Sequence, residues 1–254
     1  MRLSLLYNPL VIIDRLAVAI NRNNRKRKLR NTPASKLGIG YLSSLELLEL
    51  IKADGYDGKT IYDIGANIGT WTLLAKAFFP ESTIHAFEPL SNHLTQFNQK
   101  TKGLKNINIH TFCLGSENTE SIINVSSFSD SSSLLDSAPL EFEEFGIQKI
   151  SEEKVQVKRL DSVIESGLAT APDIVKIDVQ GFELEVLKGM GSYLNTTSYL
   201  IIEVSFKEYY LGQPLFLEIA NYLAGFDFKI YALGHSTPIG IELGQTDVLF
   251  KKQK

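Results

Sequence analysis

Hydrophobic and polar positions along this chain follow two periods, one typical of buried strands and one typical of amphipathic helices. Short apolar runs rich in β-branched residues predict strands at Thr60–Ile64, Thr83–Phe87, Ile107–Phe112, Ile174–Ile177, Tyr199–Val204, Phe228–Ala232 and Asp247–Phe250. Helical patterns separate most of these runs, at Trp71–Phe79, Asn92–Thr101, Phe182–Met190 and Leu215–Leu223. The alternation predicts an α/β fold, a doubly wound, Rossmann-like and mostly parallel sheet with helices on both faces.

The composition is that of a globular protein, with 254 residues of which 44% are hydrophobic and 22% charged. We expect a helical, basic N-terminal extension over residues 1–59 and one α/β domain over residues 60–254. A single cysteine, Cys113, excludes an internal disulfide and is expected to lie in the core. This cysteine usage is typical of a reducing compartment, so the protein is expected to be cytoplasmic.

Charge is distributed unevenly around a net value of -3. Residues 1–30 hold eight Arg and Lys against Asp14 alone, so the rest of the chain is acidic and nucleic acid is not an expected partner. The apolar stretch over residues 3–20 is interrupted by Asn8, Pro9, Asp14 and Arg15, too often for a membrane-spanning helix. A solvated helix with a basic linker is the simpler interpretation of the extension, and peripheral contact with an anionic membrane is the alternative.

The sequence "DIGANIGTWT", residues 63–72, predicts a ligand-binding turn after the first strand. Its glycines are Gly65 and Gly69 alone, and this spacing differs from the G-x-G-x-x-G pattern of dinucleotide-binding turns. The carboxylate of Asp63 before the first glycine suits a ligand with an ammonium or sulfonium charge, as in S-adenosylmethionine. Glu88, which closes the second strand 19 residues beyond Gly69, is placed to accept hydrogen bonds from a ribose.

These motifs resemble those of the FkbM-type S-adenosylmethionine-dependent methyltransferases. The similar stretches also include "FEP" at 87–89, "SSSLL" at 131–135, "VKRLDSV" at 157–163 and "DIVKIDVQGFELEVLKG" at 173–189, within residues 60–251. The resemblance implies a seven-stranded sheet whose last strand, Asp247–Phe250, is antiparallel. It also implies O-methylation of a hydroxyl on a sugar, polysaccharide or secondary metabolite. The residues that it places at the cofactor are Asp63, Gly65, Ala66, Asn67, Gly69, Glu88 and Leu114.

Catalytic groups are expected at strand ends on the same edge of the sheet. Asp178 and Glu203 each end an apolar strand, and His235 is expected on a Gly/Pro loop, whereas His85 and His93 are expected to be structural. Asp178 and Glu203 could share a divalent cation, but without an obvious third oxygen ligand we favour a metal-independent role in acid–base chemistry or substrate orientation.

The acceptor is expected to contact residues outside the regular strand–helix alternation. The segment 113–160 breaks that alternation and is expected to form an irregular wall of the acceptor site, with Ser132 and Ser133 in contact with a small-molecule or glycan hydroxyl. Glu183 is expected either to contact the acceptor or to cap its own helix. Two other functions stay open, a non-catalytic cofactor-binding protein and an NAD-dependent oxidoreductase, and no pattern predicts an oligomeric state.

Overall fold

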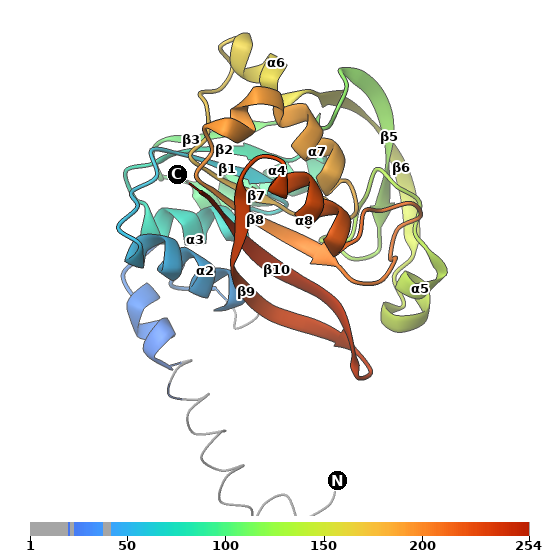
Figure 1. Cartoon of the computed structure of the whole chain (residues 1–254), viewed down its shortest axis with the longest axis horizontal. Helices are drawn as coiled ribbons and strands as arrows, with labels where there is room; N and C mark the ends of the chain where they lie inside the picture. Colours follow the sequence, from blue (N-terminus) through green and yellow to red (C-terminus); the bar gives the residue numbers. More distant parts are fainter. Residues whose placement is uncertain (1–19, 21–22, 38–41, 254) are drawn as a thin grey trace, which may run out of the picture.

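The computed structural model describes residues 20, 23–37 and 42–253, and in them a seven-stranded sheet lies at the centre (Figure 1). Its strand order is β3-β2-β1-β7-β8-β10-β9, with neighbours parallel except where β10 pairs with β8 and β9. The bounds are β1 Thr60–Ile64, β2 Thr83–Phe87, β3 Ile107–His110, β7 Ile174–Ile177, β8 Tyr199–Ser205, β9 Phe228–Ile239 and β10 Glu242–Lys252. The predicted fold class, including the antiparallel last strand, is confirmed.

Helices cover both faces of this sheet (Figure 1). One face packs against α2 (Leu42–Ala53) and α3 (Thr70–Phe78), and α4 (Ser91–Thr101) contacts α3. The other face packs against α6 (Leu160–Glu165), α7 (Glu183–Met190) and α8 (Phe216–Ala224), and the 3₁₀ helix η3 (Gly191–Asn195) follows α7. Successive strand residues therefore enter different cores, as Ile61 and Tyr62 do, and both are fully buried. Burial on both faces explains why the strands read as continuous apolar runs.

The segment 113–160 forms a second, three-stranded sheet instead of the irregular wall that we expected. Its strands are β4 (Cys113–Leu114), β5 (Thr119–Ser126) and β6 (Lys149–Lys158), in the order β4-β6-β5, and helix α5 (Pro139–Phe145) lies between β5 and β6. The hydrophobic pattern missed β6 because most of its side chains, in "KISEEKVQVK", are exposed. A strand held by pairing with β5 needs few apolar positions.

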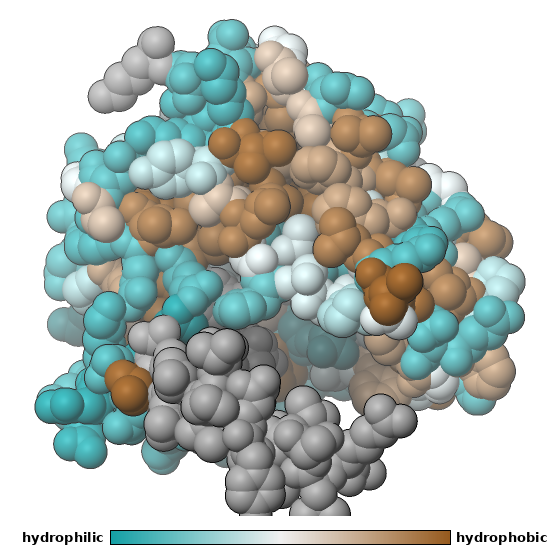
Figure 2. Space-filling view, turned by 60° about the horizontal axis from the view of Figure 1, so that its bottom comes forward, coloured by the Kyte–Doolittle hydropathy of each residue, from teal (hydrophilic) through white to brown (hydrophobic). Residues whose placement is uncertain are grey.

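Strands β9 and β10 form a hairpin that extends beyond the rest of the sheet (Figure 1). His235 lies within β9, not on a loop as expected, because β9 continues beyond its apolar start as the edge strand of the sheet. An edge strand tolerates Pro238, since a missing backbone N–H costs little where one side of the strand is unpaired. The hairpin exposes Leu233 and Leu243, and Figure 2 shows a band of hydrophobic surface crossing one face of the molecule.

The described part of the N-terminal extension packs onto the α/β domain. Leu45, Leu48 and Ile51 of α2 are buried in one cluster with residues of β1 and α3. Residues 23–29 are helical, and two of their basic side chains pair with α2, Arg25 with Glu46 and Lys28 with Glu49. The apolar residues 3–19, on which the membrane alternative depends, lie outside the described residues. Within the described ranges, every helix is too short or too polar to cross a membrane.

Candidate functional site

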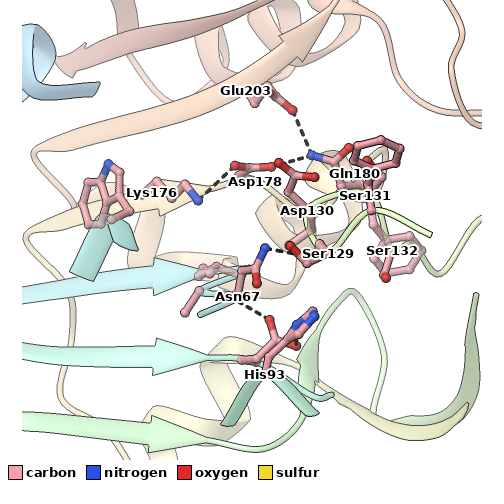
Figure 3. A pocket seen from close by; sticks show the side chains of 18 of the residues that line it. Asn67, His93, Ser129, Asp130, Ser131, Ser132, Lys176, Asp178, Gln180 and Glu203 are labelled. Carbon is pink, nitrogen blue, oxygen red and sulfur yellow. Dashed lines mark hydrogen bonds and ion pairs between the residues drawn. The ribbon is translucent and has the colours of Figure 1, made fainter. Parts of the chain in front are cut away.

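A cavity of about 620 Å³ opens at the carboxyl ends of β1, β2, β7 and β8. In Figure 3 the strands end at this cavity, with Asn67 and His93 on one side and Asp178, Gln180 and Glu203 on the other. The strand order reverses between β1 and β7, and ligands of open α/β sheets bind at such a point. Its volume is within the roughly 300–1,000 Å³ that is usual for small-molecule sites.

The turn after β1 brings backbone close to backbone. Gly65 has φ +79°, and a Cβ built on it would lie 1.9 Å from the carbonyl oxygen of Asp178 at the end of β7. Gly69 has φ +81°, and its Cβ would lie 2.8 Å from the ring of Phe97 on α4. Both glycines are therefore required by geometry. Asn67 also has a positive φ of 48°, which points its N–H toward β2.

Glu88, which follows β2, is a buried carboxylate with three donors. Its Oε2 accepts the N–H of Asn67 at 2.9 Å, and its Oε1 accepts the N–H of Leu90 at 2.9 Å. Nδ1 of His93 lies 3.1 Å from the same Oε1. A carboxylate has about four acceptor positions, so Glu88 keeps capacity for one further donor from the cavity that it lines.

Asp63 lies beneath the turn and does not line the cavity. Its Oδ2 accepts the hydroxyl of Thr72 at 2.6 Å, and its Oδ1 lies 3.8 Å from Nζ of Lys176. Complete burial raises the pKa of Asp63, while the charge of Lys176 and the hydroxyl of Thr72 act in the opposite direction. Through these two contacts, Asp63 connects the start of α3, which follows the turn, to Lys176 of β7.

A chain of polar side chains crosses the cavity wall from β7 to β8 (Figure 3). Nζ of Lys176 lies 3.0 Å from Oδ2 of Asp178. The amide Nε2 of Gln180 donates to Oδ1 of Asp178 at 2.7 Å and to Oε2 of Glu203 at 3.0 Å. The hydroxyl of Tyr210 donates to the other end of the amide, Oε1 of Gln180, at 3.0 Å. The Gln180 amide is thus fixed at both ends, its nitrogen between two carboxylates and its oxygen on the Tyr210 hydroxyl.

The charges around this chain shift its pKa values. Burial opposes the charge of Lys176, but Asp178 and Asp63 outweigh burial and raise its pKa. Burial raises the pKa of Glu203 well above its usual range, and the nearby carboxylates of Asp178 and Asp247 raise it further. Asp247 is paired with Glu203 across β8 and β10, and its pKa is raised by burial and then by Asp178. Glu203 therefore holds its proton more strongly than a solvated carboxyl does.

The loop between β5 and α5 lies against the turn and the polar chain. Nδ2 of Asn67 donates to the backbone carbonyl oxygen of Ser129 at 3.0 Å. The hydroxyl of Ser133 donates to the backbone carbonyl oxygen of Gln180 at 2.6 Å. Ser132 lines the cavity, and its Oγ accepts the N–H of Ser126. Ser133 is buried, and its hydroxyl also accepts the N–H of Leu135, so the loop connects the second sheet to the edge of the first sheet that faces the cavity.

Most of the predicted site residues gather at the cavity. Those that line it are Gly65, Ala66, Asn67, Glu88, Leu114, Ser132, Asp178, Glu203 and His235. Those outside its lining are Asp63, Gly69, Ser133 and Glu183. Glu183 instead accepts the N–H groups of Val179 and Gly181, so its carboxylate holds the turn that precedes its helix. The imidazole of His235 is 71% exposed and lies 3.6 Å from Glu46, so it is at the outer rim.

Two residues expected to be structural also line the cavity. His93 contacts Glu88 there, and Cys113 lies at the cavity wall although burial, followed by the charge of Glu88, raises its pKa to about 12. The lining residues that sequence reasoning missed include Ser44, Glu141, Lys176, Gln180, Tyr210 and Asp247. Only Lys176 carried a signal, because a lysine inside a strand buried on both faces requires a charged partner.

Asp178 and Glu203, which could have shared a divalent cation, are instead bridged by a side-chain amide. The Gln180 amide lies between Asp178 and Glu203 and bonds to both. Over residues 20, 23–37 and 42–253, no three His, Cys, Asp or Glu side chains are grouped so that they could hold a metal ion.

Comparison with known proteins identifies the family of the chain. The family model described as the methyltransferase FkbM domain matches residues 63–230, which include the turn, Glu88, the polar chain and the second sheet. The chain belongs to this family. It therefore carries a methyltransferase domain of the family that its motifs resemble.

Two curated relatives are methyltransferases. The chain is 28% identical over 167 residues to the hexuronic acid methyltransferase AglP of Haloferax volcanii, a match covering 63% of this chain and 61% of that protein's length. It is 27% identical over 173 residues to Methyltransferase 1 of Beauveria bassiana, covering 62% of this chain and 70% of that protein. Among solved structures, magnesium protoporphyrin IX methyltransferase (ChlM) from Synechocystis PCC 6803 with bound SAM has a TM-score of 0.49 at 14% identity, covering 92% of this chain and 96% of that one.

Proposed function

We propose that the chain methylates a hydroxyl oxygen of a sugar, polysaccharide or secondary metabolite. The observation that carries this proposal is the polar chain from Lys176 through Asp178 and Gln180 to Glu203, which holds two carboxylates at the cavity wall. The turn at Gly65–Asn67 borders the same cavity. One cavity therefore offers a cofactor-binding turn and groups that can take a proton from a hydroxyl.

The residues present fit S-adenosylmethionine. Gly65, Ala66 and Asn67 would surround its methionine part, Glu88 would accept a ribose hydroxyl, and Leu114 would contact the adenine. Two buried polar atoms at this end of the cavity, Oδ1 of Asn67 and Nε1 of Trp71, have no hydrogen-bond partner among the described residues. Buried polar atoms without partners are costly, and a ligand with donors and acceptors would satisfy them. When bound, this cofactor supplies a methyl group activated by a sulfonium charge.

The protein's own contribution is to orient the acceptor and remove its proton. Positioning of the acceptor oxygen supplies most of the rate in such a reaction, because effective molarity can lower a barrier by roughly 7–11 kcal/mol. Burial and the nearby carboxylates raise the pKa of Glu203, so it is a stronger base than a solvated carboxylate, and Asp178 is held in place by Lys176 and Gln180. We assign proton removal to Glu203 and acceptor orientation to Asp178. His235, at the exposed rim, would contact only the outer part of an acceptor.

The sugar acceptor is supported by one relative, AglP, which is named as a hexuronic acid methyltransferase. The matched region covers only 61% of AglP, so the acceptor of AglP is not carried over to this chain and a sugar acceptor is proposed for it separately. A non-catalytic cofactor-binding protein would keep the turn and Glu88 but would not need the polar chain. An oxidoreductase would bind NAD, for which the turn lacks the required glycine spacing.

The test combines binding with transfer. The purified full-length chain is titrated by calorimetry with S-adenosylmethionine, S-adenosylhomocysteine and NAD, and methyl transfer to a panel of hydroxylated sugars is followed by mass spectrometry. We expect both adenosyl compounds to bind and a sugar to gain one methyl group on oxygen. Binding of the adenosyl compounds without transfer to any hydroxyl would favour the non-catalytic alternative. Binding of NAD alone would overturn the proposal.

A further inference from the structure

Besides Glu88, the cavity is lined by five further acids. Their carboxylates come from α5, β8, β10 and the segments after β5 and β7, and are Asp130, Glu141, Asp178, Glu203 and Asp247. Among the described lining residues Lys176 is the one lysine, no arginine occurs, and Lys176 is already flanked by Asp63 and Asp178. Burial raises the pKa values of Glu203 and Asp247, and the repulsion among like charges around the cavity raises them further.

Glu141 of α5 is the member of this group whose bonding is incomplete. The residue is 2% exposed and lines the cavity, yet its Oε2 has no hydrogen-bond partner in the part of the chain that the structure describes. Its Oε1 accepts from the hydroxyl of Tyr210 at 2.8 Å. That hydroxyl also lies 3.1 Å from the carbonyl oxygen of Ser131 and 3.0 Å from Oε1 of Gln180. One O–H cannot donate to three acceptors at once, and its contact with Glu141 is the shortest of the three. Oε2 is therefore the oxygen of Glu141 that is left without a donor.

Tyr209 provides a second unpartnered group at the same wall. Its hydroxyl has no hydrogen-bond partner among the described residues, and the residue is 2% exposed and lines the cavity. A buried carboxylate oxygen and a buried hydroxyl that both lack a partner indicate that a ligand supplies the missing hydrogen bonds. The free oxygen of Glu141 requires a donor from the ligand, whereas the Tyr209 hydroxyl can pair with either a donor or an acceptor.

We propose that the acceptor is a hydroxylated molecule with a protonated amine, such as an amino sugar, and that Glu141 determines this specificity by binding the ammonium group. The inference rests on the proposed function, because it concerns the acceptor of the same cavity. An ammonium has three donors and a positive charge, so it both satisfies Glu141 and relieves the repulsion among the acids. A neutral hydroxyl would offer one donor and no charge. A hexuronate would bring a further negative charge to a wall of carboxylates and is excluded as the preferred acceptor.

Matched glycosides test this specificity. The full-length chain, saturated with S-adenosylhomocysteine, is titrated with methyl glucoside, its 2-amino-2-deoxy and 6-amino-6-deoxy analogues, and methyl glucuronide. These probes share a ring and differ in charge. We expect one of the amino glycosides to bind about tenfold more tightly than methyl glucoside, the size of effect for a charge-assisted hydrogen bond, and methyl glucuronide to bind most weakly.

Variants on α5 assign the effect to Glu141. Glu141→Gln keeps the shape and one acceptor oxygen but removes the charge, so it should abolish the preference for the amino glycoside. Glu143→Gln, at an exposed position of the same helix, should leave the preference unchanged. The inference is overturned if methyl glucuronide binds as tightly as the amino glycosides, if neither amino glycoside binds better than methyl glucoside, or if Glu141→Gln keeps the preference. If the unaltered chain does not bind S-adenosylhomocysteine at all, the proposed function itself is overturned.

Discussion

Asn67 and Glu88 are joined by a hydrogen bond of 2.9 Å, in which the backbone N–H of Asn67 donates to Oε2 of Glu88. The bond connects the turn after β1 to the residue after β2, so both halves of the expected cofactor site share one polar contact. It forms because Asn67 adopts a positive φ of 48°, a conformation that asparagine tolerates better than most residues. The shape of the turn and the position of the acid therefore depend on each other.

The first prediction follows from this bond. Glu88→Ala should weaken binding of S-adenosylhomocysteine by about 10- to 150-fold, since a hydrogen bond to a charged group is worth about 1.5–3 kcal/mol. Calorimetric titration measures the change. Glu117→Gln, which alters an exposed glutamate outside the cavity lining, is the control and should bind like the unaltered chain. Unchanged affinity in Glu88→Ala would remove Glu88 from the cofactor site.

The sequence predicted the strands of the main sheet because their burial on two faces produces a strong signal. β1, β2 and β7 have the predicted bounds, and the glycines and acids at their ends follow directly from that assignment. The second sheet escaped prediction because β6 is mostly exposed and β5, which pairs with β6, is buried only in its second half. Such strands leave little hydrophobic periodicity to detect.

The missed site residues have a different physical reason. Glu141, Tyr210 and Asp247 reach the cavity from α5, from the segment after β8 and from β10, elements far apart in the sequence. Their meeting depends on tertiary packing, which local patterns do not contain. Glu183 could be assigned only from coordinates, because capping and acceptor binding place the same residue type at the same position of a helix.

The second prediction concerns the close approach at Gly65. Gly65→Ala should destabilise the fold by about 3 kcal/mol or more, because the new Cβ would overlap the carbonyl oxygen of Asp178 in addition to the strain of a positive φ. Gly103 has a φ of +84° with open space around its Cα, so Gly103→Ala should lower the free energy of unfolding by only about 1 kcal/mol. Urea denaturation gives both free energies of unfolding. Equal losses would show that the contact with Asp178 is unimportant.

The third prediction concerns the pH dependence of the rate. A general base acts only when it is deprotonated, so kcat should rise as the pH passes through the raised pKa of Glu203. Glu203→Gln should lower kcat by about 10²–10⁴-fold and remove the rise of kcat with pH. Asp178→Asn should lower kcat but leave the rise with pH in place. Steady-state kinetics over a pH range measures both effects. A rise that persists in Glu203→Gln would assign proton removal to another group.

The fourth prediction concerns Glu183 and the pH dependence of stability. Burial raises the pKa of this carboxyl from 4.5 to about 7, although the backbone N–H groups that it accepts partly oppose the shift. Since the folded state binds the proton more tightly than the unfolded state, the contribution of Glu183 is fully present below pH 4.5 and is lost as the pH rises to about 7. The loss amounts to roughly 3 kcal/mol.

Glu183→Gln should remove this part of the pH dependence, because the amide oxygen can still accept the N–H groups of Val179 and Gly181 but carries no titrating proton. The free energy of unfolding, measured in urea at several pH values between 4 and 8, should therefore fall less with rising pH in Glu183→Gln than in the unaltered chain. Other buried carboxyls titrate in both proteins, so the difference between the two curves isolates Glu183. Glu165→Gln, at the exposed end of α6, should follow the unaltered chain. Parallel curves for Glu183→Gln and the unaltered chain would show that Glu183 is already ionised in the folded protein below pH 7, its charge stabilised by the backbone donors.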